Sequence, residues 1–271
     1  MKDFEVYCFG DNVKKTVCVV GLGTIGLPTA LECLKNGLVT YGYDLDTQRV
    51  KLACSKGIPA FYAWGSIPEV DVYEVCVSSN AVFDACSLIA KRDCKNVLVA
   101  IESTVVPFSC RKIFKEMFGY NVNLVHCPHR FWGLDSNNHG VKQLRVLGGV
   151  NTRSLADGTN FFGNLLDIPI HPVSCIEVAE LCKIAENVSR YLRIAYAENL
   201  SLICEEVGLS FIELQYAINT KWNTTVYDAR DGIAGSCLPF AIKSLSSFTQ
   251  YNKFLKGAIE LDKQYQRSLK E

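Results

Sequence analysis

Apolar residues near the start of the chain change their spacing in a way that predicts a strand, a helix and a second strand. Residues 16–21 form an uninterrupted apolar, β-branched run that ends in glycine, which is typical of a strand buried on both faces of a parallel sheet. In residues 27–36 the apolar positions recur every three or four residues, and Asn36 with Gly37 supplies a helix stop. Residues 39–44 then predict a second strand. Together these segments predict one βαβ unit.

The same alternation continues through the first half of the chain. Apolar runs at residues 71–77, 96–101 and 122–127 are separated by segments long enough for crossover helices. Residues 145–150, which contain Gly148 and Gly149, predict a late strand. This order is typical of an α/β fold with a Rossmann-like, doubly wound parallel sheet.

A different pattern begins near residue 174. Residues 177–207 contain neither proline nor glycine and are rich in helix-forming residues, which predicts one long helix. Its apolar face is expected to carry Val178, Leu181, Ile184, Val188, Leu192 and Ala195. Further helical patterns lie at 210–218 and after Pro239. We therefore predict a nucleotide-binding domain over residues 1–170 and a smaller all-helical domain with a long central helix over 171–271.

Charge and composition limit the kinds of partner that the protein is expected to bind. The chain has 28 basic and 28 acidic residues, and this balance disfavours nucleic acid as a partner. Acids precede any apolar run in residues 1–5, and no segment approaches the roughly 18 apolar residues of a membrane span. The 13 cysteines, which start at Cys8, include no pair at CxxC spacing. We expect a cytoplasmic protein whose cysteines are mostly reduced core thiols.

A glycine-rich motif predicts the nucleotide site. Residues 21–26 read Gly-Leu-Gly-Thr-Ile-Gly between a predicted strand and a predicted helix, and Asp44 ends the next strand 18 residues beyond Gly26. We expect Gly21 to make the tight turn, Gly23 to let the backbone approach the ligand, and Gly26 to allow close packing of the helix. Thr24 and Ile25 belong to the same turn.

Asp44 is expected to bind the ribose hydroxyls of an adenosine and to repel a 2′-phosphate, which argues against NADP. S-adenosylmethionine and NAD carry the same ribose diol, so this carboxylate does not separate them. A glycine turn serving an unrelated ligand is the remaining alternative. We also include Ser78, at the end of the run 71–77, in the cofactor-binding set.

Five ordered motifs resemble the UDP-glucose/UDP-N-acetylmannosamine dehydrogenase family. They are residues 21–28, residues 102–107, Glu180-Leu181 with Lys183, Glu186-Asn187 and Arg190, Asn219-Thr220, and residues 235–239. The resemblance implies that Cys237 is a thiol that takes up an aldehyde, that Lys183 and Asn187 stabilise an oxyanion, and that Thr104 contacts the cofactor and a water molecule.

The sequence departs from that family at positions of chemical importance. His129 follows the proline where the family has an acid, and Ala241 stands where the family has an aspartate. Family members continue into a third domain that completes the UDP site, whereas this sequence ends at Glu271. These departures favour loss of the oxidation chemistry.

As a two-domain, cysteine-rich chain on this scaffold, the protein resembles the S-adenosylmethionine-dependent pyridinol C-methyltransferases with which methanogens build the iron-guanylylpyridinol cofactor of [Fe]-hydrogenase. The resemblance implies methyl transfer from S-adenosylmethionine to a small hydroxypyridine, with Lys183 stabilising an oxyanion and His129 moving a proton. An NAD-dependent dehydrogenase related to the UDP-sugar 6-dehydrogenases is the first alternative. A non-catalytic nucleotide-binding relative is the second.

Structural explanations compete with each catalytic role. Lys183 can be a solvated residue paired with Glu180 or Glu186, and Cys237 a core thiol. His129 can hydrogen-bond a backbone carbonyl, and Thr104 can cap a helix.

We expect no metal site, since His126, His139 and His171 are too widely spaced. The partners expected are a small-molecule substrate and a second copy of the chain, docked through the long helix to form a homodimer.

Overall fold

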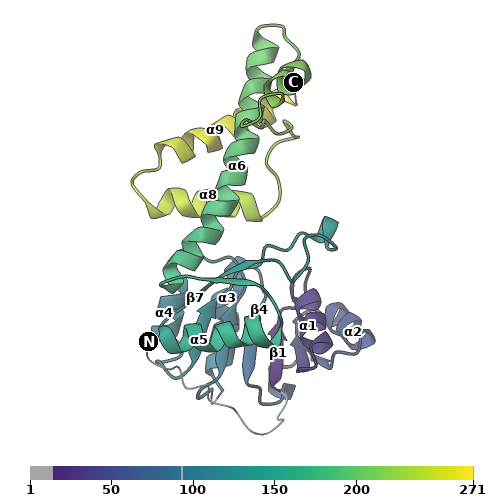
Figure 1. The fold of residues 1–271 in the computed structure, drawn as a ribbon, viewed down its shortest axis with the longest axis vertical. Coiled ribbons are helices and arrows are strands. Elements are labelled where there is room, and N and C mark those ends of the chain that lie inside the picture. Colours follow the sequence, from purple (N-terminus) through teal and green to yellow (C-terminus); the bar gives the residue numbers. More distant parts are fainter. Residues whose placement is uncertain (1–14, 93, 271) are drawn as a thin grey trace.

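The computed structural model describes residues 15–92 and 94–270. The expectations drawn from residues 1–5 and from Cys8 therefore lie outside the described residues. The described chain folds into an eight-stranded sheet with helices on both faces, and a long helix leads from this sheet into a group of further helices (Figure 1).

The strands follow the predicted apolar runs closely. They are β1 (Thr16–Val20), β2 (Val39–Tyr43), β3 (Ala60–Phe61), β4 (Val72–Val75), β5 (Leu98–Ile101), β6 (Asn123–His126), β7 (Arg145–Gly149) and β8 (Ile170–Pro172). Their order in the sheet is β3-β2-β1-β4-β5-β6-β7-β8. This confirms the predicted Rossmann-like α/β class.

Two strands at one edge of the sheet, β7 and β8, run opposite to the other six. β7 pairs with β6 in antiparallel orientation, and β8 is parallel to β7. The segment between β6 and β7 holds only a short 3₁₀ turn at Gly133–Asp135. Without a crossover helix the chain returns from the end at which β6 finished, which gives an antiparallel neighbour. The sheet is therefore mixed.

Helices cover the sheet in two layers (Figure 1). Those of the sheet half are α1 (Gly26–Lys35), α2 (Thr47–Ser55), α3 (Val82–Ala90), α4 (Ser109–Glu116) and α5 (Thr152–Thr159), which continues as a π-helical segment, Asn160–Leu165. One apolar core packs α3, α4 and the first residue of α6 against the sheet, and the other packs α1 and the π-helical segment against the opposite face. Alternate residues of each strand serve the two cores.

The long helix α6 (Ile176–Glu206) confirms the prediction of one continuous helix. Its start is buried against β7: a Cβ atom on Gly148 would lie 2.7 Å from the Cα of Ile176. The predicted apolar face is wrong at two positions, since Val178 and Leu181 are exposed, whereas Ile184, Val188 and Ala195 are buried. The sheet, rather than a bundle, covers the first turns of α6, and this changes the face that is buried.

The remaining helices are α7 (Phe211–Asn219), α8 (Cys237–Phe248) and α9 (Lys253–Ser268). α8 and α9 pack across α6 and form a third apolar core with it (Figure 1). The division at residue 170 stays a prediction. Within residues 15–92 and 94–270, no helix is both long enough and apolar enough to cross a membrane.

The buried cysteines agree with their expected role as core residues. Cys18, Cys33, Cys86 and Cys110 are buried free thiols, whereas Cys54 is exposed. Burial raises the pKa of Cys18 and Cys86 to about 12, so these thiols stay protonated and unreactive.

Candidate functional site

The glycine-rich turn between β1 and α1 has the geometry that its sequence predicts. Gly21 has φ +93°, and a Cβ atom there would lie 2.7 Å from the carbonyl oxygen of Cys76. A Cβ atom on Gly26 would lie 1.7 Å from the carbonyl oxygen of Gly21. At Gly23 the nearest atom is the end of the flexible Arg49 side chain, 3.4 Å away. The turn is thus closed on its inner side and open where a phosphate would approach.

Asp44 lies directly after β2 and is only 8% exposed. Its Oδ2 accepts a hydrogen bond from the Leu22 amide at 2.7 Å, and its Oδ1 accepts one from the Asp46 amide at 2.9 Å. Arg49 Nη1 lies 3.5 Å from Oδ2. The carboxylate is therefore fixed beside the glycine turn, where each oxygen still has acceptor capacity for a ribose hydroxyl.

The other predicted cofactor residues lie at the same edge of the sheet. Thr24 is exposed and Ile25 immediately precedes α1. Ser78 follows β4 and is exposed, and Thr104 follows β5 and is half-buried. The carboxyl ends of neighbouring parallel strands meet at one edge, which is where ligands of open α/β sheets bind.

Thr104 does not cap a helix, since α4 begins only at Ser109. Glu180 of α6 satisfies that helix end instead: its carboxylate accepts hydrogen bonds from the Phe108 amide at 2.6 Å and the Cys110 amide at 2.7 Å. The alternative role of Thr104 as a cap is therefore wrong. Glu180 has a structural task, since it ties α6 to the start of α4.

Lys183 is not the solvated surface residue of the competing explanation. Its Nζ donates a hydrogen bond to the carbonyl oxygen of His129 at 2.6 Å. Glu186, its expected alternative partner, forms an ion pair with Arg130. Burial lowers the pKa of Lys183, and the neighbouring charges of Glu186 and Cys237 oppose this shift. A partly desolvated lysine beside a cysteine is a typical arrangement for stabilising oxyanions.

Asn187 lies one helical turn beyond Lys183 and is buried. Its Nδ2 has no hydrogen-bond partner among the residues that the structure describes. Cys237 is the first residue of α8, which packs against α6, and it is exposed. The alternative that Cys237 is a core thiol is therefore wrong. Near the end of the sheet, the structure offers an ammonium, an amide donor and an accessible thiol.

Only the backbone carbonyl of His129 contacts these site residues, through its hydrogen bond from Lys183. Its ring is 4% exposed and contacts the Glu102 carboxylate, with Nε2 also 3.0 Å from the Thr29 hydroxyl. Burial lowers the pKa of His129, and the charge of Arg145 lowers it further. The ring lies in the core between α1 and the sheet, so the expected proton transfer by His129 at the substrate is not supported. The alternative expectation, a hydrogen bond from the His129 ring to a backbone carbonyl, is also not met, because the ring contacts the side chains of Glu102 and Thr29 instead.

The sequence did not predict that Arg145 and Glu102 form a buried ion pair. Arg145 is 1% exposed, and its Nη1 donates to Glu102 Oε2 at 2.7 Å. Burial acts to raise the pKa of Glu102, but His129 and Arg145 outweigh it and lower the value to about 2. An arginine inside an otherwise apolar strand is the sequence signal that could have indicated a buried acidic partner.

Two family models match separate parts of the chain. Residues 16–129 match the NAD binding domain of 6-phosphogluconate dehydrogenase, and residues 177–263 match the central domain of the UDP-glucose/GDP-mannose dehydrogenase family. The chain has the scaffold of the UDP-sugar dehydrogenases. The glycine turn and Asp44 belong to the first matched part, and Lys183, Asn187 and Cys237 belong to the second.

Similar proteins point the same way. UDP-N-acetyl-D-mannosamine dehydrogenase of Methanococcus maripaludis is 26% identical over an alignment that covers 93% of this chain and 66% of that protein. The enzyme of the same name from Escherichia coli K12 is 27% identical and covers 82% and 63%. The chain thus spans about two thirds of the length of these relatives.

Solved structures share the fold. UDP-D-ManNAc dehydrogenase from Pyrococcus horikoshii superposes with a TM-score of 0.83 at 22% identity, covering 92% of this chain and 68% of that one. The 3-hydroxyisobutyrate dehydrogenase of Mycobacterium tuberculosis superposes with a TM-score of 0.74 at 14% identity, covering 93% and 94%. The fold of this chain is therefore shared by solved dehydrogenases of which it covers different shares, 68% in one and 94% in the other.

The expectation of an S-adenosylmethionine-dependent pyridinol C-methyltransferase is wrong. The matches that cover most of the chain are dehydrogenases, and the nucleotide half matches an NAD-binding model. The expectation rested on His129 and Ala241 in place of two acids and on the position at which the sequence ends, and neither is positive evidence for methyl transfer. The expectations of S-adenosylmethionine as the cofactor and of a role in [Fe]-hydrogenase cofactor synthesis are therefore also wrong.

Proposed function

We propose that the protein is an NAD-dependent dehydrogenase related to the UDP-sugar 6-dehydrogenases. The observation that carries this proposal is the position of Lys183: it is partly buried, it is hydrogen-bonded to the segment that follows β6, and its helix packs against α8, which begins at Cys237. This end of the sheet also carries the glycine turn and Asp44. An NAD-type turn and an oxyanion-stabilising group at one edge are what alcohol oxidation requires.

The residues around the glycine turn fit NAD. Gly23 leaves space for the pyrophosphate, the first amides of α1 face it, and Asp44 is fixed where it accepts ribose hydroxyls. NAD, when bound, accepts a hydride from the substrate carbon. Ser78 and Thr104, which follow β4 and β5 on one side of β1 in the sheet, are proposed to contact the cofactor.

Lys183, Asn187 and Cys237 are proposed to act on the substrate carbonyl. The exposed thiol of Cys237 releases its proton to solvent, and the thiolate adds to an aldehyde carbon, which forms a carbon–sulfur bond and moves the negative charge to the carbonyl oxygen. The Lys183 ammonium and the free Nδ2 of Asn187 stabilise that oxygen. The hydrogen bond from Lys183 to the His129 carbonyl keeps the ammonium oriented before substrate binds.

Sugar nucleotides are the substrate class that the relatives favour, since the two relatives described above are named UDP-N-acetyl-D-mannosamine dehydrogenases. His129 and Ala241 stand where that family carries acids. Complete oxidation of a primary alcohol to a carboxylate consumes two NAD, whereas oxidation to the aldehyde consumes one. The NADH formed per substrate therefore reports whether the second oxidation occurs without those acids.

The test is NADH formation by the purified chain with UDP-N-acetylmannosamine and UDP-glucose, together with calorimetric titration of NAD. We expect NAD to bind and Asp44→Ala to weaken it by about tenfold or more, since a charge-assisted hydrogen bond contributes about 1.5–3 kcal/mol. Lys183→Ala is expected to abolish turnover without loss of NAD binding.

The matched control is Cys54→Ser, which changes an exposed cysteine outside the site, and it is expected to behave as the unmodified chain. Cys237→Ser is expected to stop the reaction before the second oxidation. Failure of NAD to bind would refute the proposal. Binding of NAD without turnover of either sugar nucleotide would instead favour a non-catalytic nucleotide-binding relative.

A further inference from the structure

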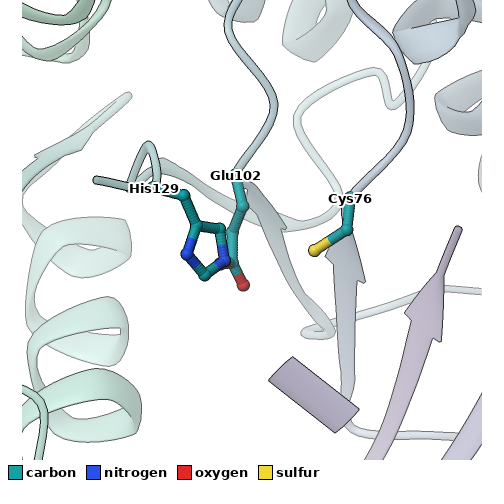
Figure 2. A group of neighbouring side chains, drawn as sticks. All are labelled: Cys76, Glu102 and His129. Carbon is teal, nitrogen blue, oxygen red and sulfur yellow. The ribbon is translucent and has the colours of Figure 1, made fainter. Parts of the chain in front are cut away.

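A compact group of potential metal ligands lies inside the sheet half of the protein. Cys76, Glu102 and His129 follow the carboxyl ends of β4, β5 and β6, and one ligand atom from each lies within 4.8 Å of the others. Figure 2 shows the three side chains turned toward one another at this edge. The part of the chain that the structure describes contains no other such group.

The register of the sheet explains why the group forms. Along β4, Tyr73 and Val75 face the core that contains α3 and α4, whereas Val72 faces the core that contains α1. Because side chains alternate between the two faces, Glu74 and Cys76 are directed to the α1 side. Glu102, which follows β5, joins them there. Polar groups are thus gathered in an otherwise apolar core.

Several of these buried polar atoms lack a partner. Glu102 and His129 are 2% and 4% exposed, yet Oε1 of Glu102 and Nδ1 of His129 form no hydrogen bond with any described residue. Oε1 of the fully buried Glu74 is in the same condition. Each unsatisfied buried polar atom costs about 1–3 kcal/mol. Nε2 of His129 is the ring nitrogen on the side of Glu102 (Figure 2) and Thr29, so a cation bound there would give Oε1 of Glu102 the partner that the protein does not supply.

The donor set selects the type of cation. A thiolate, an imidazole and a carboxylate are ligands that Zn²⁺ accepts together, whereas Mg²⁺ and Ca²⁺ prefer oxygen alone. The hydroxyl of Thr29, 3.0 Å from Nε2 of His129, adds an oxygen at the same place. Three protein ligands with a fourth position filled by oxygen match the usual coordination number of zinc.

Charge also balances in the enclosed site. Arg145 already holds Oε2 of Glu102 at 2.7 Å and stacks over Phe162, with 5.8 Å between the guanidinium carbon and the ring centre. Glu102 and a Cys76 thiolate carry two negative charges and a zinc ion carries two positive charges, so the ion and its charged ligands are neutral together.

We propose that Cys76, Glu102 and His129 bind one Zn²⁺ ion. The ion joins the ends of three strands underneath the glycine turn, since the carbonyl oxygen of Cys76 lies against Gly21. Its role is structural: it fixes the floor of the nucleotide site. The ligands are 26 and 27 residues apart, which matches no sequence motif, and this explains why the sequence predicted no metal. The inference does not depend on the proposed function.

The test is metal analysis of the full chain, unfolded and refolded with Zn²⁺ because the site is enclosed, then dialysed extensively. We expect one zinc per chain, and little or none in Cys76→Ser or His129→Asn. The matched controls Cys54→Ser and His171→Asn change exposed residues of the same types and are expected to retain the metal. Circular dichroism checks that every variant folds.

Refolding the unmodified chain with Co²⁺ gives a second measurement. This measurement does not depend on whether the variants fold. Thiolate ligation of cobalt produces a sulfur-to-metal charge-transfer band, and tetrahedral coordination gives intense visible absorption. Both are expected. Zinc-free protein after refolding, equal zinc in the Cys76→Ser variant, or bound cobalt without the charge-transfer band would each overturn the proposal.

Discussion

At the scale of single residues, Glu198 is a buried carboxyl group whose oxygens lack hydrogen-bond donors among the described residues. It lies on α6, is fully buried, and neither of its oxygens has a hydrogen-bond partner among the described residues. The nearby Asp262 of α9 is satisfied by the Tyr191 hydroxyl and the Ile233 amide, both at 2.9 Å. Burial, followed by the charge of Asp262, raises the pKa of Glu198 to about 8. At neutral pH this side chain is mostly protonated in the folded protein.

This predicts a fall in stability as the pH rises. A glutamate in the unfolded chain ionises near pH ~4.3, so from there up to about pH 8 the folded state holds the additional proton. The free energy of unfolding then decreases with pH, by at most about 1.4 kcal/mol per pH unit. Glu198→Gln removes this dependence and makes the protein more stable than the unmodified chain at alkaline pH.

Urea denaturation at several pH values across this window measures the effect. The control is Glu206→Gln, which changes an exposed glutamate at the end of α6 and should leave the slope unchanged. If Glu198→Gln and the unmodified chain show the same slope, Glu198 is ionised in the folded state.

The candidate site could be predicted in part from single residues. Asp44 and the glycines were found because local spacing determines their geometry. The contact between Lys183 and the His129 carbonyl was not, since 54 residues separate them and a backbone oxygen carries no side-chain signal. His129 drew attention as an unusual residue, but its neighbours in space decide which way its ring points.

At the scale of elements, the turn between β1 and α1 contains one glycine that ligand binding requires and another that folding requires. A methyl group at Gly23 would touch only the movable end of Arg49, whereas one at Gly26 would collide with the backbone of Gly21. Gly23→Ala is therefore expected to fold with an unchanged melting temperature. It should bind NAD about tenfold more weakly or worse, a loss of about 1.4 kcal/mol, because the methyl group projects toward the pyrophosphate.

Calorimetry with NAD and a thermal melt measure the two effects separately. Gly65→Ala is the matched control, since a Cβ atom there has no neighbour within 4 Å, and both its affinity and its stability should be normal. Normal NAD affinity in Gly23→Ala would show that the cofactor does not pass over this turn.

The elements themselves were predictable where one interaction dominates. The long helix was expected over residues 177–207 and spans Ile176–Glu206, because its composition alone favours a helix. The direction of β7 was not predictable from its apolar pattern, which is the same for either orientation. The exposure of Val178 and Leu181 was missed for a similar reason, since periodicity does not say which neighbour covers a helix.

At the scale of the whole molecule, apolar side chains gather on the part most distant from the sheet. None of the residues of α7, Phe211–Asn219, is buried. Ile212 is 63% exposed and Tyr216 72% exposed, and Tyr196 and Ile203 of α6 are also exposed. Monomeric proteins seldom leave so many large apolar residues uncovered in one region.

We therefore keep the homodimer as a proposal, with the end of α6 and α7 as its interface. Sedimentation analysis is expected to show a dimer for the unmodified chain and a monomer for the double variant Ile212→Glu with Tyr216→Glu, because two buried like charges oppose association. Leu134→Glu, at a 90% exposed position of the sheet half, is the control and should remain dimeric. A monomeric unmodified chain would exclude this interface.

The unbroken course of α6 limits how the protein can open and close. Its first residue is packed in the core of the sheet, and Lys183 and Asn187 follow within the first turns of the same helix. A hinge at the junction would have to bend an intact helix, so the lysine and the amide travel with the nucleotide half as one piece. Cys237 begins α8, and α8 packs against α6 in the third apolar core. The sulfur is therefore held on the same pair of helices as the lysine and the amide, and any gating motion has to come from other segments.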